Sequence, residues 1–380
     1  MRIATPMMAA PVLALALTAQ AAAQDLTWTF EEIGTGIKPA LALDPDGAPH
    51  VSFLTEAIMG ATFYATNKGG AWDVETVAEG YFYGPVDIDV APDGTPFIVY
   101  HDHEASSFNP ELGSGVILSR TNGAWNRAVI MDSGHDQWDA DVAAEAGGVW
   151  HFAGVDPVQF GSQVGLEYAT NAFGDIVVEE VGSGPIPYEF GVSIELGRDG
   201  VVGISFHDSS VLHYAERGPG PGGNWTVKTI DEEGDVGRYS DLAYDPAGNP
   251  HISYWRFDST NGGTVRHAWR DEGGAWQAED VGTLANVESG FTGARKITAL
   301  EVDASGTPHI MYGDKAEIVY AVRGQGGGWS RQVAFSSPDA RLGQLVEFDL
   351  DAEGRPHVTY FEVTNPNPLE GTVLYGTADN

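Results

Sequence analysis

The sequence predicts an all-β fold, a seven-bladed β-propeller whose last blade is closed by a strand from the N-terminal part of the chain. Three observations predict it. A sequence unit recurs at intervals of 47 to 58 residues, each unit divides into four short strand-like segments, and the segment missing from the last unit stands near the N-terminus. No stretch after residue 23 has a helical period.

The first segment of the chain has the order of an export signal. Arg2 precedes an apolar run over Met7–Leu17, and the small residues Ala21–Ala23 follow. This order is typical of a secretory signal peptide, and the run is too short to cross a bilayer. We therefore expect cleavage after residue 23, a single propeller domain over 24–380, and a secreted or periplasmic mature protein.

Composition narrows the possible partners. The chain has no cysteine and a formal net charge of −35, which excludes disulfides, thiolate metal sites and thiol nucleophiles. Such an acidic chain repels nucleic acid and anionic membrane surfaces, so neither is an expected partner. No phosphate-binding or dinucleotide fingerprint is present, so we expect no organic cofactor. A closed ring does not require assembly, and we expect a monomer.

The repeat divides into strands in the same way each time. An inner segment such as LALD is followed by a turn rich in Pro, Asp and Gly, which indicates a hairpin. A second segment such as PHVSF, a third such as TFYAT and a fourth such as AWDVETV follow, and all are rich in aromatic and β-branched residues. One position marks the second strand of every unit: His50, Phe97, His151, Gly203, His251, His309 and His357.

The two ends of the chain complete the count. The seventh unit ends near Tyr375 without a tryptophan strand, and Thr27–Ile33 matches the fourth strand Ala71–Val77 of the first unit. The N-terminal strand is therefore expected to become the outer strand of the last blade. This closure removes the open end of the repeat array.

These repeats resemble a known group. The segments PHVSF, PHISY, PHIMY and PHVTY, strands of the form LxYA, and the Gly-Trp turns resemble bacterial secreted seven-bladed β-propeller repeat proteins. The resemblance covers about residues 26–376. It implies the fold but no particular function, since propellers host many activities.

Residues that recur in most units are expected to build the blades. The histidines of the second strand are expected to form hydrogen bonds within or between blades. The recurrent tryptophans are expected to pack between blades: Trp72, Trp125, Trp225, Trp276 and Trp329.

Carboxylates cluster on one side of the inner strands. Of fourteen positions in two adjacent rows, eight are Asp or Glu, and strand alternation turns both rows toward the central channel. Clustered carboxylates raise one another's pKa unless a cation neutralises them. A Ca²⁺ ion held by Asp89, Glu195, Glu301 and Asp349 is one prediction. The alternative is a water-filled channel with carboxyls protonated or paired with Arg or Lys.

Blade-specific residues gather on the loops from the second to the third strand and on the links between blades. Both sets lie on one face of a propeller, here called the top face. The candidate ligand-binding residues on it are His101, Asp102, His103, His135, Asp136, Trp138, His207, Asp208, Trp255 and Arg256. Histidines beside carboxylates suit Zn²⁺ or Cu²⁺, a less favoured metal prediction than Ca²⁺, or proton transfer. Aromatics with arginines suit a sugar ring or an anionic polysaccharide. The alternative is that these residues only stabilise their loops.

Three functions remain open, and whether the protein is an enzyme is one of the open points. The favoured one is a binding module that holds a glycan or an extracellular protein on its top face, because hydrolase and metalloprotease motifs are absent. The second is an enzyme acting on an extracellular polysaccharide. The third is a metal-binding propeller.

The enzyme alternative rests on a resemblance of fragments. Phe97–His103, Ser205–His207 and Leu212–Ala215 are similar to loops and strands of propeller polysaccharide lyases. The resemblance implies catalytic roles for His101, His207, Arg238 and Tyr239. A Tyr or His would take the proton beside a uronate carboxyl while Arg neutralises that carboxyl.

Overall fold

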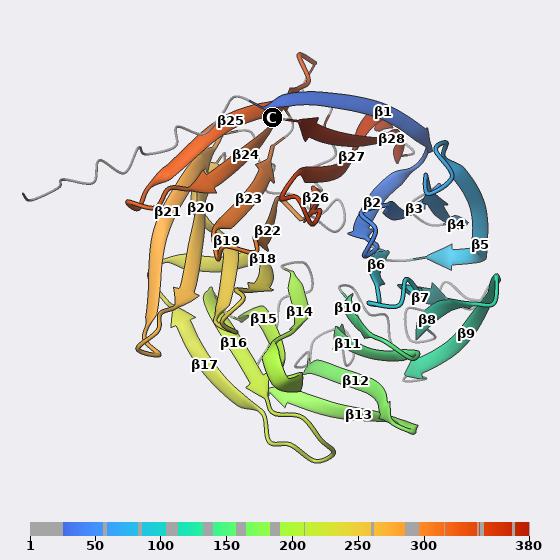
Figure 1. Cartoon of the computed structure of the whole chain (residues 1–380), viewed down its shortest axis with the longest axis horizontal. Coiled ribbons are helices and arrows are strands. Elements are labelled where there is room, and N and C mark those ends of the chain that lie inside the picture. Colours follow the sequence, from blue (N-terminus) through green and yellow to red (C-terminus); the bar gives the residue numbers. More distant parts are fainter. Residues whose placement is uncertain are drawn as a thin grey trace, which may run out of the picture.

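The computed structural model describes residues 26–55, 59–82, 86–103, 113–131, 140–156, 165–182, 191–208, 210–259, 262–285, 296–314, 316–339, 342, 346–366 and 369–379. In this part of the chain, seven blades of four antiparallel strands surround a central axis, as Figure 1 shows. The predicted fold class is confirmed. The signal-peptide prediction falls on residues outside the description and stays a prediction.

The first four blades follow one another along the chain, each from the inner to the outer strand. Blade 1 contains β2 (Ile37–Leu43), β3 (Pro49–Leu54), β4 (Met59–Thr66) and β5 (Asp73–Phe82). Blade 2 contains β6 (Asp87–Val90), β7 (Pro96–His103), β8 (Gly113–Thr121) and β9 (Ala124–Met131). Blade 3 contains β10 (Ala140–Glu145), β11 (Val149–Asp156), β12 (Gly165–Phe173) and β13 (Asp175–Gly182). Blade 4 contains β14 (Val192–Leu196), the short 3₁₀ helix η1 (Arg198–Gly200), β15 (Val202–Asp208), β16 (Val211–Arg217) and β17 (Thr226–Asp231).

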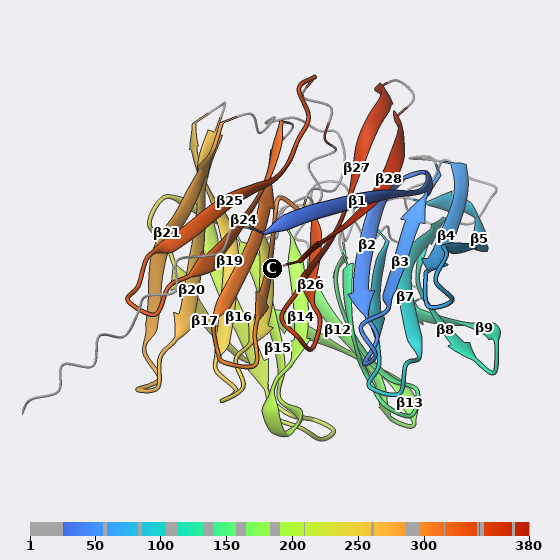
Figure 2. The same cartoon turned by 45° about the horizontal axis from the view of Figure 1, so that its top comes forward.

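The last three blades close the ring. Blade 5 contains β18 (Asp235–Tyr244), β19 (Pro250–Ser259), β20 (Gly262–Arg270) and β21 (Trp276–Leu284). Blade 6 contains β22 (Thr298–Val302), β23 (Pro308–Gly313), β24 (Glu317–Arg323) and β25 (Trp329–Ser336). Blade 7 contains β26 (Glu347–Leu350), β27 (Pro356–Pro366), β28 (Leu369–Asp379) and β1 (Thr27–Thr35). In the tilted view of Figure 2, the hairpin of β27 and β28 projects on the top face.

The closing strand is β1, as the sequence predicts. It pairs antiparallel with β28 from Thr27 opposite Asp379 to Thr35 opposite Thr372, and Figure 1 shows it at the outer rim. The backbone at Leu26 exchanges two hydrogen bonds with the side-chain amide of Gln332 on β25, at 2.9 and 2.7 Å. The start of the described chain is therefore fixed to two blades.

Blades 1 and 2 are joined more closely than the repeat suggests. The end of β5 pairs with the end of β7, through Tyr81 opposite His103 and Phe82 opposite Asp102. The two blades thus form one eight-stranded sheet. This pairing was not expected, because the repeat does not show that β5 runs far enough to meet the next blade.

The recurrent histidines and tryptophans have structural roles, as expected. In blade 1 the Nδ1 atom of His50 lies 2.6 Å from the hydroxyl of Tyr64, and the ring of Trp125 from blade 2 meets Tyr64 edge-on at 5.1 Å. The same histidine–tyrosine hydrogen bond occurs in blades 3, 6 and 7, between His151 and Tyr168, His309 and Tyr320, and His357 and Tyr375.

The apolar cores lie between neighbouring blades. Leu212 and Tyr214 of blade 4, for example, pack against Leu242 and Ile252 of blade 5. Burial of these side chains holds each blade to the next. Among the described residues, no helix is long and apolar enough to cross a membrane.

Candidate functional site

The predicted top-face residues fall only partly within the described chain. His135, Asp136 and Trp138 lie outside it, and of His103 only the backbone is described. The others stand near the top face, at the ends of second strands or at the start of an inner strand.

His101 on β7 and His207 on β15 occupy equivalent positions in blades 2 and 4. Both side chains are buried, and blade 3 separates them. Asp102 instead accepts a hydrogen bond from Arg127 of its own blade at 2.8 Å. Within the described ranges, no three His, Asp or Glu side chains are grouped to hold a metal ion. The Zn²⁺ or Cu²⁺ prediction stays a prediction.

A polar cluster forms where blade 4 meets blade 5. The Nε2 atom of His207 lies 3.5 Å from Oδ1 of Asp235, and Asp235 accepts two hydrogen bonds from the guanidinium of Arg238, one of them 2.9 Å long. That guanidinium lies 5.0 Å from the ring centre of Phe257. These four residues, His207, Asp235, Arg238 and Phe257, are called the junction cluster.

The charge state of the junction cluster follows from these contacts. Burial alone would raise the pKa of Asp235, but the hydrogen bonds with His207 and Arg238 bring it below its ordinary value. Asp235 is therefore an ionised acceptor at neutral pH. The side chains of Arg238 and Asp235 keep 20% and 23% of their surface exposed, so the pair is partly open to solvent.

Tyr239 and Trp255 form a wall behind the junction cluster. Their rings are stacked at 5.9 Å, and Trp255 meets Phe257 edge-on at 5.5 Å. Both side chains are buried, Trp255 to 2% exposure, and they pack against blade 6. Trp255, predicted as a ligand-binding aromatic, therefore lies inside the wall rather than on the surface.

The backbone at this wall is tightly constrained. Tyr239 has a φ of 54, in the left-handed region. A Cβ atom at Gly191 of blade 4 would lie 2.7 Å from Cα of Tyr239. Glycine at 191 thus allows blades 4 and 5 to approach closely at the top face.

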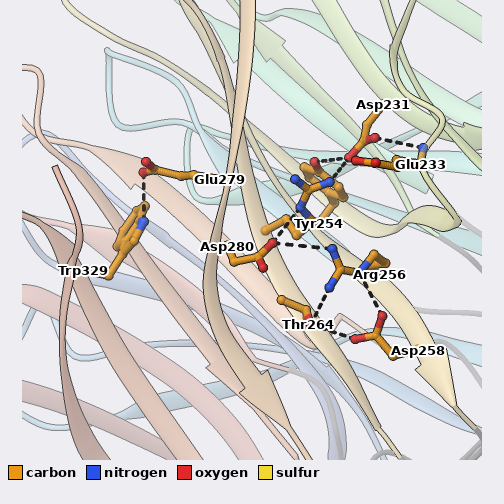
Figure 3. Close-up of polar contacts among 10 residues, drawn as sticks. Asp231, Glu233, Tyr254, Arg256, Asp258, Thr264, Glu279, Asp280 and Trp329 are labelled. Carbon is orange, nitrogen blue, oxygen red and sulfur yellow. Dashed lines mark hydrogen bonds and ion pairs between the residues drawn. The ribbon is translucent and has the colours of Figure 1, made fainter.

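Arg256 belongs to a separate network on blade 5, which Figure 3 shows. Its guanidinium lies 3.6 Å from Asp280, which also accepts a hydrogen bond from Arg266 at 2.9 Å. Arg266 in turn pairs with Asp231 of blade 4. The other members are Asp258, Thr264 and Tyr254. The network links β17 of blade 4 to β19, β20 and β21. Asp208, also predicted as a ligand-binding residue, is the last residue of β15, and its side chain is partly exposed.

The channel carboxylates join neighbouring blades. Asp89 accepts hydrogen bonds from the backbone N–H of Val90 at 2.6 Å and from that of Ala144, in the next blade, at 2.7 Å. Asp349 does the same with Leu350 at 2.6 Å and with Leu43 of blade 1 at 2.8 Å. Asp141 and Asp241 likewise accept from Ile194 and Leu300 of the following blades.

A lysine neutralises part of the channel. Lys296 binds Asp241 at 3.1 Å and Glu347 at 2.8 Å. Burial alone would lower the pKa of the Lys296 amine, but the surrounding carboxylates raise it well above its ordinary value. This contact corresponds to the alternative in which a carboxyl pairs with Lys.

No hydrogen bond or ion pair within the described residues joins the four predicted calcium ligands to a basic side chain, although the charge of Lys296 acts to lower the pKa of Glu301. Burial raises the pKa of Asp89 to about 6 and that of Asp349 to about 7. It raises the pKa values of Glu195 and Glu301 well above the ordinary value. Calcium binding by these four carboxylates stays a prediction. Two of them, Asp89 and Asp349, already accept hydrogen bonds that join neighbouring blades.

Sequence reasoning did not find Asp235, Phe257 or Lys296. A signal for the lysine was available. Arg238 and Lys296 each stand three residues before the channel-facing positions Asp241 and Ala299, and no other unit has a basic residue there. Asp235 carried no such signal, because its contact with His207 crosses from one blade to the next.

Blades 4 and 5 both depart from the repeat where they meet. Gly203 replaces the recurrent histidine, and the hydroxyl of Tyr244 from blade 5 fills the space and lies 2.7 Å from that of Tyr214. A Cβ atom at Gly203 would lie 2.1 Å from the Tyr244 oxygen. In blade 5 His267 stands where blades 1, 3, 4, 6 and 7 have tyrosine. Residues that break a repeat are free to serve a single site.

No family model and no curated protein sequence matches the chain. Among solved structures, an ulvan lyase of a polysaccharide lyase family is similar with a TM-score of 0.59 and 10% identity, over 89% of this chain and 93% of the other. An α-L-arabinanase of Penicillium chrysogenum is similar with a TM-score of 0.51 and 12% identity, over 91% of this chain and 97% of the other. At these identities the likeness establishes the propeller fold alone.

Proposed function

We propose that this protein binds a glycan at the junction cluster, on the top face between blades 4 and 5. The observation that carries the proposal is the partly exposed Asp235–Arg238 pair beside the ring of Phe257. It lies where the repeat is broken and where a buried histidine and two buried aromatic rings fix its position.

The three groups match the chemistry of a sugar ring. The carboxylate of Asp235 accepts hydrogen bonds from hydroxyl groups, and the guanidinium of Arg238 donates them. The ring of Phe257 offers an apolar face to the C–H groups of the sugar. A few oriented polar groups beside an aromatic surface are typical of small-ligand sites.

The charges favour a neutral glycan over a uronate polymer. Arg238 is already paired with Asp235 through two hydrogen bonds, so its charge is balanced before a uronate carboxyl arrives. The formal net charge of −35 also repels a polyanion. Both points favour binding over the lyase alternative, as does the burial of His207 and Tyr239, the residues that would serve as base.

The structural neighbours are consistent with a glycan ligand. One ulvan lyase structure, with a TM-score of 0.58, is bound to -[GlcA(1-4)Rha3S]-, and the arabinanase is complexed with arabinobiose. They support the choice of glycans as the first ligands to test, and they leave open whether this chain is a binding module or an enzyme.

The test measures binding of the mature protein to a panel of neutral and uronate oligosaccharides by calorimetry. We expect at least one neutral oligosaccharide to bind. Arg238→Ala should weaken its affinity by about tenfold or more, since a hydrogen bond to a charged group is worth about 1.5–3 kcal/mol. Phe257→Ala should weaken it as well.

The matched control is Arg120→Ala. Arg120 pairs with Glu75 at 3.0 Å and lies 5.8 Å from the ring centre of Trp125, so it has the same kind of surroundings away from the junction cluster. Its loss should leave affinity unchanged. Equal loss in both arginine variants, or no binding to any neutral glycan, would refute the proposal. Release of unsaturated, ultraviolet-absorbing products from a uronate polymer, lost in His207→Ala, would establish the lyase alternative instead.

A further inference from the structure

Blade 5 departs from the histidine–tyrosine pairing that four other blades share. In blades 1, 3, 6 and 7 a second-strand histidine bonds a third-strand tyrosine. In blade 5 the third-strand residue is His267, and Nδ1 of His251 lies 3.0 Å from its Nε2. The rings are 5.1 Å apart, and the exposed fractions of His251 and His267 are 6% and 0%. Two buried imidazoles therefore share one hydrogen bond.

Charged groups face both outer nitrogens of the pair. Oδ2 of Asp245 lies 3.8 Å from Nε2 of His251, and Oε1 of Glu279 lies 3.7 Å from Nδ1 of His267. Glu279 in turn accepts hydrogen bonds from Arg323 at 2.6 Å and from Trp329 at 2.9 Å, both of blade 6. The pair thus stands at the junction of blades 5 and 6.

A count of hydrogens shows why this pair differs from the others. Two neutral imidazoles carry two N–H hydrogens, one of which occupies the contact. A third hydrogen is accommodated on an outer nitrogen beside Asp245 or Glu279. A fourth must enter the 3.0 Å contact, where two N–H groups would point at each other and no acceptor would remain.

The histidine–tyrosine pairs have no such conflict. When the histidine is protonated, its Nδ1–H donates to the tyrosine oxygen, and the hydroxyl hydrogen rotates away. His50 and Tyr64 in blade 1 can therefore keep their hydrogen bond in both charge states. The conflict is specific to two facing imidazoles.

We propose that the His251–His267 pair is a pH-sensitive contact that opens the junction between blades 5 and 6 in acid. Full protonation breaks the contact and moves His267 away from the rings of Trp269 and Trp329, which it meets at 5.0 and 5.4 Å. Burial lowers the pKa of His267, and burial together with the neighbouring His267 lowers that of His251 to about 3. Both shifts agree with a pair that resists protonation while folded.

The sign of the effect follows from linkage. In the unfolded chain both histidines take up protons near pH 6.5. Below that pH the folded pair lacks at least one proton that the unfolded chain binds. Each such proton raises the unfolding equilibrium constant about tenfold per pH unit. Stability is therefore lost as pH falls below about 6.5.

The experiment compares the wild type with His267→Tyr, which restores the histidine–tyrosine pairing of blades 1, 3, 6 and 7. Amide hydrogen exchange is followed by mass spectrometry from pH 7 to pH 5, corrected for the intrinsic pH dependence of exchange. In the wild type, protection of β19, β20 and β24 should fall relative to the other blades as the pH is lowered. His267→Tyr should remove this local loss and reduce the pH dependence of the unfolding constant by about tenfold per pH unit.

A reciprocal variant guards against a failure of His267→Tyr to fold. Tyr64→His places a second imidazole opposite His50 and should create a new acid-labile junction between blades 1 and 2. Uniform protection across the wild-type blades down to pH 5, or a Tyr64→His variant whose blade 1 behaves as before, would overturn the proposal.

Discussion

Replacement of Lys296 by methionine tests the electrostatics of the channel. Lys296 bonds Asp241 and Glu347 at 3.1 and 2.8 Å, and its side chain is 25% exposed. Methionine keeps an apolar stem of similar length but cannot carry the charge. Loss of the cation leaves two largely buried carboxylates without the positive charge that balances them. The variant should therefore be less stable than the wild type.

The loss of unfolding free energy in Lys296→Met depends on pH, and the direction of that dependence follows from the pKa values of the channel carboxyls. Burial raises the pKa of Glu347 to about 7, although Lys296 lowers it. A carboxyl whose folded pKa is raised contributes stability that is present below its unfolded pKa of about 4 and is lost as pH rises through the folded value. Without Lys296 the folded pKa rises further. We expect a loss of about 3–5 kcal/mol at pH 8, the usual cost of breaking a buried ion pair.

At pH 5 the loss should be well below that at pH 8, because Glu347 is already protonated there in the wild type. Urea unfolding at the two pH values, followed by tryptophan fluorescence, measures both losses. The control is Lys228→Met, since Lys228 is 44% exposed and lies 3.8 Å from Glu216. Its effect should stay within about 1 kcal/mol at both pH values. An equal loss for Lys296→Met at pH 5 and pH 8 would refute the electrostatic reasoning.

Three further predictions concern single contacts. Glu179→Ala leaves Arg217, whose side chain is 1% exposed, without its carboxylate and should cost about 3–5 kcal/mol of unfolding free energy. The equivalent Glu75→Ala removes a 38% exposed carboxylate and should cost no more than about 1 kcal/mol; similar losses would contradict this contrast. Gly203→Ala should cost about 1–3 kcal/mol through the clash with Tyr244, and Tyr244→Phe in the same chain should recover much of that loss in thermal unfolding. If calcium occupies the channel row, elemental analysis of protein purified without chelators should give stoichiometric calcium, and a metal-free protein would remove that prediction.

The fold was predictable because each blade repeats the same local rules. Alternating apolar residues, a Pro-Asp-Gly turn and a Gly-Trp turn specify a four-stranded unit without reference to its neighbours. Even the closing strand was predictable, since Thr27–Ile33 matches a strand that the seventh unit lacks. The local sequence pattern and the overall architecture agree here, so the sequence is sufficient to predict the fold.

The site was less predictable because its contacts cross between blades. The pairing of His207 with Asp235 depends on an irregular register at the start of β18. The space left by Gly203 is filled by Tyr244, which belongs to the following unit. Comparison of the repeats reveals that both positions are unusual, but not that they meet. The burial of Trp255 has the same cause, since blade 6 covers it.

The two buried titratable systems act on stability in opposite directions. Carboxyls such as Asp349, with a raised folded pKa of about 7, bind protons that the unfolded chain has released, so they favour the folded state in acid. Histidines such as His251, with a lowered folded pKa, exclude protons that the unfolded chain binds below pH 6.5, so they favour it at neutral pH. Lys296→Met should therefore destabilise mainly above pH 7, and His267→Tyr should stabilise mainly below pH 6.5. Because Glu347 and Asp349 line the channel and the His251–His267 pair lies between blades 5 and 6, the opposite signs separate these two sources of pH dependence within one molecule.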